Sequence, residues 1–335
     1  MRALVTGVSS FTGAWFALAL VARGFAVTGV HRRARTDYPP EAQARLALLE
    51  GRVALLRAPA LDSEPVRDAL ARERPRLLCL HGAEVGAHRA ADFDVLGAVA
   101  RTTAGIDRLL DRFAGAGGRA VLVTGSVFEA EEGRGAAPLR AVNPYGLAKT
   151  LTWQVLRFAV ERRNLALGKF VVAHPVGPFD KPTGLVPDLL AAWRRGEAAV
   201  LRRPRLVRDF LAIDGLAAAY ARAALALLEH GHRVHLVPSL WPEPVRAFAR
   251  RLSAAIGPRL SVRCTVREAE PPEPSEEPTV RTGLHDLCAL VPAWDPEAFW
   301  NAFARSIQRP LDARETCALV ARACGAVTSA LATAA

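Results

Sequence analysis

The start of the chain constrains the fold more than any other stretch, because an apolar strand, a turn of small residues and an apolar helix follow one another. Residues 2–6 are typical of a buried strand, and the pattern predicts a helix over 12–23 that Gly24 ends. Between them, residues 6–13 read Thr-Gly-Val-Ser-Ser-Phe-Thr-Gly. Such a turn before a helix N terminus offers backbone N–H groups and the helix dipole to an anion. The pattern opens a βαβ unit and predicts an α/β fold with a doubly wound parallel sheet.

The turn departs at one position from the pattern Thr-Gly-x-x-Gly-x-x-Gly. Gly7 and Gly13 stand where such a turn needs glycine, whereas Ser10 replaces the middle glycine. A side chain at this position narrows the approach to a pyrophosphate, and a plain strand–helix turn is the alternative interpretation. The residues that we assign to cofactor binding in this turn are Gly7, Ser10, Phe11, Thr12 and Gly13.

The next predicted strand, residues 26–30, ends in His31, Arg32 and Arg33. An acidic residue here would accept hydrogen bonds from an adenosine ribose, whereas arginines favour a 2′-phosphate. We therefore assign these three residues to the cofactor and expect NADP, with NAD as the second choice. Two solvated arginines in an arginine-rich chain are the alternative.

Residues 76–80 predict a further strand, which is followed by His81, Gly82 and Ala83. Ligands bind at the carboxyl ends of strands in an open parallel sheet, and small residues there let a cofactor lie close to the backbone. We assign these three residues to cofactor binding, with a structural role for His81 as an equal alternative.

A helix is predicted over 95–113, and then a strand over 119–123 that leads into Thr124 and Ser126. Hydroxyl groups at this end of a strand can hydrogen-bond a carbonyl oxygen as negative charge develops on it. Both residues are therefore candidates for catalysis, and a local backbone cap is the alternative for each.

Tyr145 and Lys149 are four residues apart on a predicted helix that Asn143 caps and Pro144 begins. This spacing places both side chains on one face of the helix, one turn apart. A phenol is a poor acid–base catalyst at neutral pH, and an ammonium group nearby favours the phenolate and lowers the phenol pKa. The pair predicts an acid/base tyrosine, and an ordinary amphipathic helix is the alternative.

Composition excludes more than it identifies. The formal charge is +11, but all except three of the 44 basic residues are arginines spread along the chain, which favours anionic small ligands over nucleic acid. The five cysteines are scattered without metal-ligand spacing, so we expect no metal and reduced thiols in a cytoplasm. We see neither an apolar run long enough to span a membrane nor a signal peptide.

The order of these motifs resembles the extended short-chain dehydrogenase/reductase superfamily, the NAD(P)-dependent epimerase/dehydratase family. The resemblance covers about residues 1–305. The motifs that carry it are, in chain order, the glycine turn, His81-Gly82-Ala83, Val127-Phe128, Tyr145 with Lys149, Gly177-Pro178, Arg208-Asp209-Phe210 and Trp294-Asp295-Pro296. Within the superfamily, the chain looks most like the GDP-mannose 4,6-dehydratases and the GDP-4-keto-6-deoxy-mannose reductases.

The resemblance implies a Rossmann domain with a smaller C-terminal substrate-binding domain. It implies that Thr124 is the catalytic hydroxyl, Tyr145 the acid/base, and Lys149 its partner on the nicotinamide ribose. It adds Pro175 to the cofactor site. For the substrate we assign His174, Glu84 and Arg208, whose guanidinium can take a diphosphate bidentately.

The chain departs from the family at several positions. The dehydratases follow their threonine with two acidic residues that drive elimination, whereas this chain has Gly125 and Ser126. This disfavours a dehydratase, although Glu129 could substitute. The aspartate that contacts adenine in the family is replaced by Pro59, which puts the adenine pocket in doubt.

We therefore predict an NADP-binding domain over 1–173 with a returning strand near 234–237, a substrate-binding domain over 174–307 and a helical extension over 308–335. The predicted function is an NADP-dependent reductase of a keto group on a nucleotide-linked sugar. An epimerase with tightly held NAD(P) is the main alternative; a 4,6-dehydratase, a reductase of another small-molecule ketone and a non-catalytic scaffold are the others. The resemblance also implies a homodimer, formed through the helices over 95–113 and 145–163.

Overall fold

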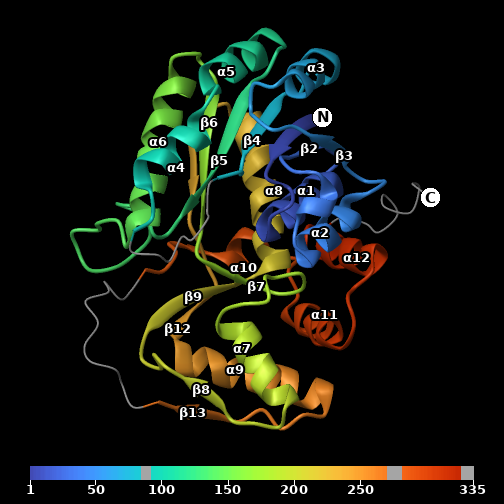
Figure 1. The fold of residues 1–335 in the computed structure, drawn as a ribbon, viewed down its shortest axis with the longest axis vertical. Helices are drawn as coiled ribbons and strands as arrows, with labels where there is room; N and C mark the ends of the chain where they lie inside the picture. Colours follow the sequence, from blue (N-terminus) through green and yellow to red (C-terminus); the bar gives the residue numbers. More distant parts are fainter. Residues whose placement is uncertain (84–91, 270–280, 326–335) are drawn as a thin grey trace.

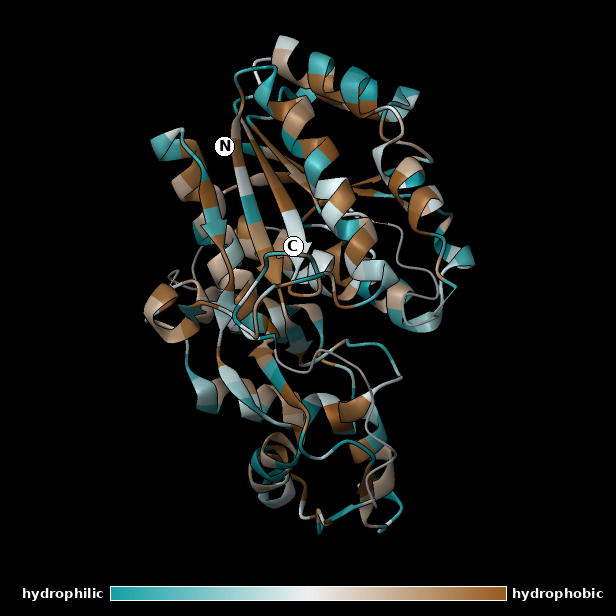
Figure 2. Cartoon of the chain, turned by 90° about the vertical axis from the view of Figure 1, so that its left-hand side faces the viewer, coloured by the Kyte–Doolittle hydropathy of each residue, from teal (hydrophilic) through white to brown (hydrophobic). Residues whose placement is uncertain are grey.

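The computed structural model describes residues 1–83, 92–269 and 281–325 (Figure 1). A large α/β layer structure occupies the upper part of the view, and a smaller group of short strands and helices lies below it. Figure 2 shows that the strands of the large sheet are mostly hydrophobic, whereas the helices that cover them carry hydrophilic residues on their outer faces.

The large sheet has seven strands, all parallel, in the order β10-β6-β5-β4-β1-β2-β3. Its strands are β1 Arg2–Thr6, β2 Ala26–His31, β3 Ala54–Arg57, β4 Leu77–Leu80, β5 Ala120–Ser126, β6 Ala166–Val172 and β10 Val234–Leu236. From β1 the order runs outward through β2 to one edge and through β4 to the other. Such a reversal leaves a crevice at the carboxyl ends of the strands. The predicted doubly wound parallel sheet is confirmed.

Helices cover both faces of this sheet. The first face carries α1 Phe11–Ala22, α2 Pro40–Leu49 and α8 Ile213–His230, and the second α3 Glu64–Glu73, α4 Val95–Thr103, α5 Ile106–Gly115 and α6 Pro144–Glu161. A short helix, η1 Arg35–Asp37, precedes α2. Successive β5 side chains point to opposite faces, so Ala120 and Leu122 join the core under α1 and α8, whereas Val121 and Val123 join the core under α5 and α6.

The prediction of one helix over 95–113 is wrong. The chain forms two helices, α4 and α5, and Gly105 between them has a φ of 75° in the left-handed region. Only glycine adopts this conformation without a steric penalty, and it breaks the helical hydrogen bonding. The apolar residues of the sequence keep a helical spacing across Gly105, so the sequence pattern did not reveal the break.

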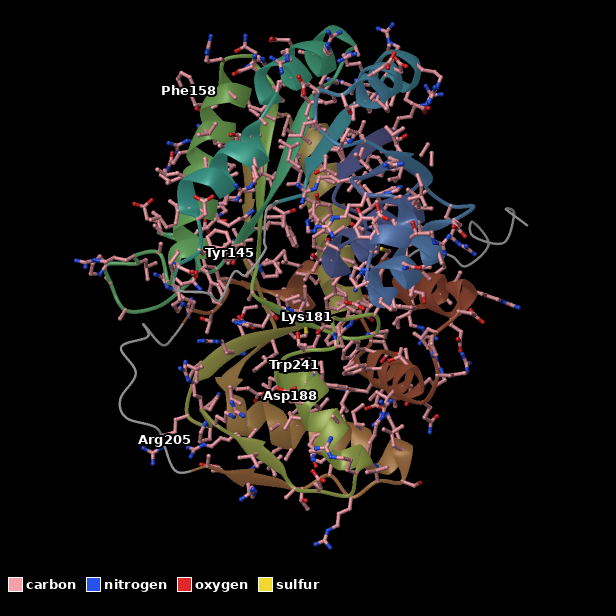
Figure 3. All side chains as sticks on the ribbon, in the orientation of Figure 1. Tyr145, Phe158, Lys181, Asp188, Arg205 and Trp241 are labelled. Atoms are coloured by element: carbon pink, nitrogen blue, oxygen red, sulfur yellow. The ribbon has the colours of Figure 1, made fainter. Side chains whose placement is uncertain are left out.

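The smaller part of the molecule is built from short strands and four helices among the described residues. The strands are β7 His174–Val176, β8 Ala199–Leu201, β9 Val207–Ala212, β11 Pro238–Ser239, β12 Trp241–Pro244, β13 Val266–Glu268 and β14 His285–Asp286; the helices are α7 Leu185–Arg194, α9 Val245–Leu260, α10 Leu287–Leu290 and α11 Pro296–Gln308. Strand β9 pairs with β7 in parallel and with β12 in antiparallel orientation. Its Phe210 stacks on Phe248 of α9 in an aromatic cluster that includes Trp241 (Figure 3).

The chain passes between the two parts more than once. Helix α8 packs on α1 and β6, and β10 completes the large sheet, although both follow β7 to β9 in sequence. Near the C terminus, α12 Ala313–Ala323 packs against α1 and α8, and Asp312 begins it with a capping box. Within the predicted helical extension over 308–335, residues 313–323 therefore form a packed helix. None of the described helices is long and apolar enough to cross a membrane.

Candidate active site

The predicted cofactor turn lies where the ends of β1 and β4 meet, at the reversal of strand order. Gly7 has a φ of +73°, and a Cβ atom added to it would lie 2.7 Å from the Cα atom of Gly82. A Cβ atom on Gly13 would lie 2.3 Å from the carbonyl oxygen of Gly7. Both distances are shorter than real Cβ atoms show. The turn and the segment after β4, residues 81–83, therefore pack this closely only because positions 7 and 13 are glycine.

The N terminus of α1 keeps donors for an anion. Ser10 caps the helix, because its Oγ accepts a hydrogen bond of 3.1 Å from the N–H of Gly13. Within the described chain, the N–H groups of Phe11 and Thr12 donate to no protein group. Two adjacent donors at a helix N terminus suit phosphate oxygens, so the turn fits the pyrophosphate of a dinucleotide despite the serine.

His81 lies between this turn and Thr124. Its Nε2 is 2.9 Å from Ser10 Oγ and 3.1 Å from Thr12 Oγ1, and its Nδ1 is 3.0 Å from Thr124 Oγ1. The Oγ1 of Thr6 accepts hydrogen bonds from the N–H groups of both His81 and Gly82, which fixes the backbone here. Burial, aided by the charge of Lys149, lowers the pKa of His81 to about 3. The imidazole is therefore neutral.

The structure confirms the helix that carries Tyr145 and Lys149. The Asn143 side chain accepts a hydrogen bond of 2.8 Å from the N–H of Gly146, and Pro144 is the first helical residue of α6. Figure 3 shows Tyr145 at the end of α6 that faces the smaller part of the molecule. Lys149 Nζ donates a hydrogen bond of 2.6 Å to the carbonyl oxygen of Thr124. This contact fastens the first turns of α6 to the end of β5.

The expected effect of Lys149 on the phenol is wrong for the protein alone. Burial raises the pKa of Tyr145 above its ordinary value, and the negative charge of Glu129 raises it further. Burial also lowers the pKa of Lys149, and the charge of Lys169 adds to this. The ammonium of Lys149 is directed at a carbonyl oxygen, so its influence on the phenol is outweighed by desolvation. The resting Tyr145 is a neutral phenol.

Glu129, which the sequence offered as a substitute for the acid of a dehydratase, is held by other partners. Its carboxylate is fully buried, lies 2.5 Å from Lys169 Nζ and accepts a hydrogen bond of 2.7 Å from the N–H of Ser126. A Cβ atom on Gly125 would lie 2.8 Å from Cε of Lys169. The buried ion pair therefore occupies the space where a side chain at position 125 would begin, and Ser126 Oγ accepts from the N–H of Phe128.

This ion pair belongs to a network that sequence reasoning missed. Lys169 Nζ also lies 2.6 Å from Glu132 and 4.6 Å from the centre of the Trp153 ring, and His235 lies 2.9 Å from Glu132. The network borders a cavity of about 310 Å³ between α6 and the edge of the sheet. The sequence signal that could have revealed this network is Lys169, a lysine in the middle of an apolar strand. A charge buried there needs buried groups of opposite charge.

The segment after β2 is organised by a residue that the sequence analysis did not single out. The hydroxyl oxygen of Tyr38 accepts hydrogen bonds of 3.0 and 3.1 Å from the N–H groups of Arg32 and Arg33. His31 Nδ1 lies 3.0 Å from the carbonyl oxygen of Arg33. These contacts give the predicted adenosine end of the site a defined backbone.

The predicted substrate residues come from the smaller part of the molecule. His174 and Pro175 lie on β7, and the His174 ring contacts Phe128, which follows β5, with ring centres 5.6 Å apart. Arg208 lies on β9, whose Phe210 is in register with His174. Glu84 lies outside the described residues. The structure thus brings His174 beside the end of β5. Arg208 lies on the neighbouring strand β9, two residues before Phe210, which pairs with His174.

Two further residues hold distant segments together, a role that the sequence analysis did not assign to either. Buried Asp209, next to Arg208, accepts hydrogen bonds from the N–H groups of Leu240 and Gly283 at 3.0 and 2.7 Å. Arg45 of α2 donates hydrogen bonds of 2.9 and 2.8 Å to the carbonyl oxygens of Ser9 and Phe179. Arg45 therefore links the cofactor turn to the segment that follows Gly177-Pro178. Among the described residues, no cluster of His, Cys, Asp and Glu could hold a metal ion.

Comparison with solved structures shows what this architecture is similar to. UDP-glucose-4-epimerase from Stenotrophomonas maltophila, with bound NAD and formylated UDP-arabinopyranose, gives a TM-score of 0.67 at 17% identity, over 92% of this chain and 99% of that chain. UDP-glucose 4-epimerase from Thermus thermophilus, in complex with NAD, gives 0.65 at 21% identity, over 93% and 100%. The dTDP-glucose 4,6-dehydratase DesIV from Streptomyces venezuelae, with NAD and TYD bound, gives 0.65 at 19% identity, over 92% and 96%.

Comparison at the sequence level identifies the family. No curated protein sequence matches the chain significantly. The model of the NAD dependent epimerase/dehydratase family matches residues 3–237, which span the glycine turn, the end of β5 and the Tyr145 helix. The chain therefore belongs to the NAD-dependent epimerase/dehydratase family and is an enzyme of the extended short-chain dehydrogenase/reductase type.

Proposed function

We propose that the turn of residues 6–13 binds the pyrophosphate of a nicotinamide dinucleotide. The N–H groups of Phe11 and Thr12 would donate to phosphate oxygens, as their position at the start of α1 favours. Gly7 and Gly82 leave no side chain between the backbone and the cofactor. When bound, the oxidised cofactor supplies a hydride acceptor and a positive charge that favours the phenolate of Tyr145.

The reaction that we propose is epimerisation of a nucleotide-linked sugar through a transient ketone. Tyr145 takes the proton of the reacting hydroxyl as hydride leaves the same carbon, and it returns the proton to the oxygen when hydride is delivered to the opposite face. The Thr124 hydroxyl hydrogen-bonds the reacting oxygen. Lys149 holds α6 against the end of β5 and so keeps Tyr145 and Thr124 at one site.

One observation carries this choice. The positions where an eliminating acid would stand are Gly125 and Ser126, and the nearby carboxylate of Glu129 is buried against Lys169. Proton and hydride transfer at one carbon needs no such acid, whereas loss of water does. The structurally similar proteins are mostly epimerases of UDP-linked sugars with NAD, which supports a nucleotide sugar as substrate.

The test is an incubation of the purified enzyme with UDP-glucose and, separately, with UDP-glucuronic acid, without added reductant. We expect each active substrate to reach an equilibrium with its C4 epimer, and we expect no deuterium at C4 when the reaction runs in D₂O. Hydride that returns from the cofactor does not exchange with solvent. Stoichiometric consumption of NADPH with a keto sugar, and no epimer in any incubation, would overturn the proposal.

The second candidate is an NADP-dependent reductase of a nucleotide-linked keto sugar. Two observations favour it: Arg32 and Arg33 follow β2, where a 2′-phosphate would lie, and the resting Tyr145 is a protonated phenol, ready to donate to a ketone oxygen. Fluorescence titration with NADPH and NADH separates the two cofactors. A reductase should bind NADPH more tightly and lose about tenfold of that affinity in Arg33→Ala.

We also propose that the enzyme is a homodimer through α4 and α6. Both helices carry exposed apolar side chains: Leu96 of α4 is 74% exposed and Phe158 of α6 is 64% exposed. Figure 3 shows Phe158 on the outer side of α6. Leu147 and Val155 extend the same face of α6. Light scattering should give a dimer for the wild type and a monomer for Phe158→Glu, with Val200→Glu on the distant β8 as a control that stays dimeric. A monomeric wild type would remove the claim.

A further inference from the structure

Ser10, the residue by which the glycine turn departs from its pattern, has a hydrogen-bonding arrangement that fixes the direction of its proton. Its Oγ accepts a hydrogen bond from the N–H of Gly13 at 3.1 Å and lies 2.9 Å from Nε2 of His81. The hydroxyl still has its own proton to donate, and among the described residues Nε2 of His81 is the acceptor that lies within hydrogen-bond distance of it. We infer that Ser10 donates this proton to Nε2 of His81. A glycine at position 10 has no hydroxyl and could not donate this hydrogen bond.

This donation determines the tautomer of His81. The imidazole is neutral, because burial and Lys149 lower its pKa to about 3, so only one of its nitrogens carries a proton. Thr12 Oγ1 is a second hydroxyl at Nε2, at 3.1 Å, and it too can donate. A nitrogen that accepts from hydroxyls has no proton of its own. The proton therefore resides on Nδ1, which donates to Thr124 Oγ1 at 3.0 Å.

The opposite tautomer would change what Thr124 can do. With the proton on Nε2, Nδ1 would accept the hydroxyl proton of Thr124, and Thr124 could then only accept a hydrogen bond from a substrate. With the proton on Nδ1, Thr124 accepts from His81 and keeps its own proton for a second partner. The buried Tyr220 hydroxyl lies near Thr124 but forms no hydrogen bond of standard geometry with a described residue.

We propose that Ser10 and His81 are positioning residues: Ser10 holds His81 in the Nδ1–H tautomer, and His81 thereby leaves the hydroxyl proton of Thr124 free to be donated to the reacting oxygen of the substrate. The inference rests on the proposed role of Thr124 in hydride transfer at a carbon that bears oxygen. A donated proton stabilises the negative charge that develops on this oxygen, whereas a lone pair repels it.

The framework around His81 is rigid enough for this role. Thr6 fixes the backbone of His81 and Gly82, and the ring packs edge-on against Phe16 of α1 with centres 5.3 Å apart. The imidazole thus has one position, with its two nitrogens directed at different hydroxyl groups.

The first test measures the tautomer and needs no turnover. In protein labelled with ¹⁵N-histidine, the NMR signals of His81, assigned by their loss in His81→Asn, should show a protonated Nδ1 and an unprotonated Nε2. Because Thr12 is a second donor, the decisive variant is Ser10→Ala/Thr12→Val, in which we expect a mixture or the Nε2–H form. Ser9→Ala, in the same turn, is the matched control and should keep the wild-type signals. A wild-type His81 with its proton on Nε2 would overturn the inference, whatever reaction the enzyme performs.

The second test measures kcat, KM and cofactor affinity separately. If Ser10 and His81 only supported the fold, kcat would not fall selectively. The double variant should lower kcat about tenfold to a hundredfold with little change in KM or in cofactor affinity, since one donor to the reacting oxygen is worth this much. Ser10→Thr/Thr12→Val restores a hydroxyl at position 10 and should recover most of the loss. His81→Asn, which places an amide N–H at the position of Nδ1, should retain more activity than His81→Gln. Equal rates for the alanine and threonine variants, or a loss confined to cofactor affinity, would contradict the inference.

Discussion

Two hydrogen-bonded networks meet at the end of β5, one on each face of the sheet, and they differ in kind. On the α1 side, the hydroxyls of Ser10 and Thr12 and a neutral His81 lead to Thr124. On the α6 side, Lys169 is buried between two carboxylates directly below Gly125. Hydroxyls and a neutral imidazole can redirect protons at little cost, whereas buried charges hold one arrangement. We therefore expect the first network to direct a proton, as proposed above, and the second to hold the strand in place.

The charged network also decides which chemistry the site lacks. Its lysine and carboxylate fill the space beside position 125, and its Glu129 holds the N–H of Ser126. A side chain at position 125 would require the buried Lys169 and Glu129 side chains to shift. The difference between the two faces thus supports the proposed proton and hydride transfer at one carbon over elimination, for which positions 125 and 126 supply no acid.

The largest expected effect comes from removing the charge at the centre of the α6-side network. Lys169→Met leaves two carboxylates buried without their cation, which should lower the free energy of unfolding by about 3–5 kcal/mol. Urea denaturation measures this, with Arg250→Met, at an exposed position in the middle of α9, as a control that should change by less than about 0.5 kcal/mol. A loss below about 1 kcal/mol for Lys169→Met would show that the network does not hold the strand.

A further buried carboxylate, Asp214, sharpens the comparison, because its partners are N–H groups, whereas Glu129 is paired with a lysine. Asp214 accepts hydrogen bonds from the N–H of Gly215 and the indole of Trp294, and burial raises its pKa to about 7. Since the folded state then binds a proton that the unfolded state has released, stability should fall as pH rises from about 4 to 7, by up to about 4 kcal/mol. Thermal melts of Asp214→Asn should lack this decline and exceed the wild type at pH 8. Parallel pH profiles for the two proteins would refute the assignment.

The smallest of these effects tests whether Gly125 is required for space. A Cβ atom there would lie 2.8 Å from Lys169 and 3.0 Å from Glu129, so Gly125→Ala should cost about 1–3 kcal/mol of stability. Gly115→Ala is the matched control, because nothing lies within 4 Å of its added Cβ atom. The two variants are compared by urea denaturation, and equal stabilities would mean that the ion pair tolerates a side chain beside it.

The features that could be predicted from the sequence are those that local residues determine. The glycine turn, the Asn143 cap and Pro144 at the start of α6 act over a few residues, and each forms where the pattern predicted it. The doubly wound sheet follows from the alternation of apolar strands and helices. The break at Gly105 was missed because helical periodicity carries no information about one left-handed residue.

The networks could not be predicted because they join residues that are distant in sequence. Lys169 and Glu132 come from different elements, and only the packing of β6 against the segment after β5 brings them together. Likewise, the sequence showed Ser10 as a departure from a pattern, and the structure was needed to show His81 beside it. The shift of the Tyr145 pKa was predicted in the wrong direction, since spacing along a helix does not report burial.

The measurement that tests the account most directly compares Tyr145→Phe with the wild type in the epimerisation assay and in cofactor titration. The account predicts that turnover falls by about 10²–10⁴-fold, because the acid/base is lost, while cofactor affinity changes little. Turnover within a few-fold of the wild type would contradict it, because the reaction would then proceed without the residue around which the site is built.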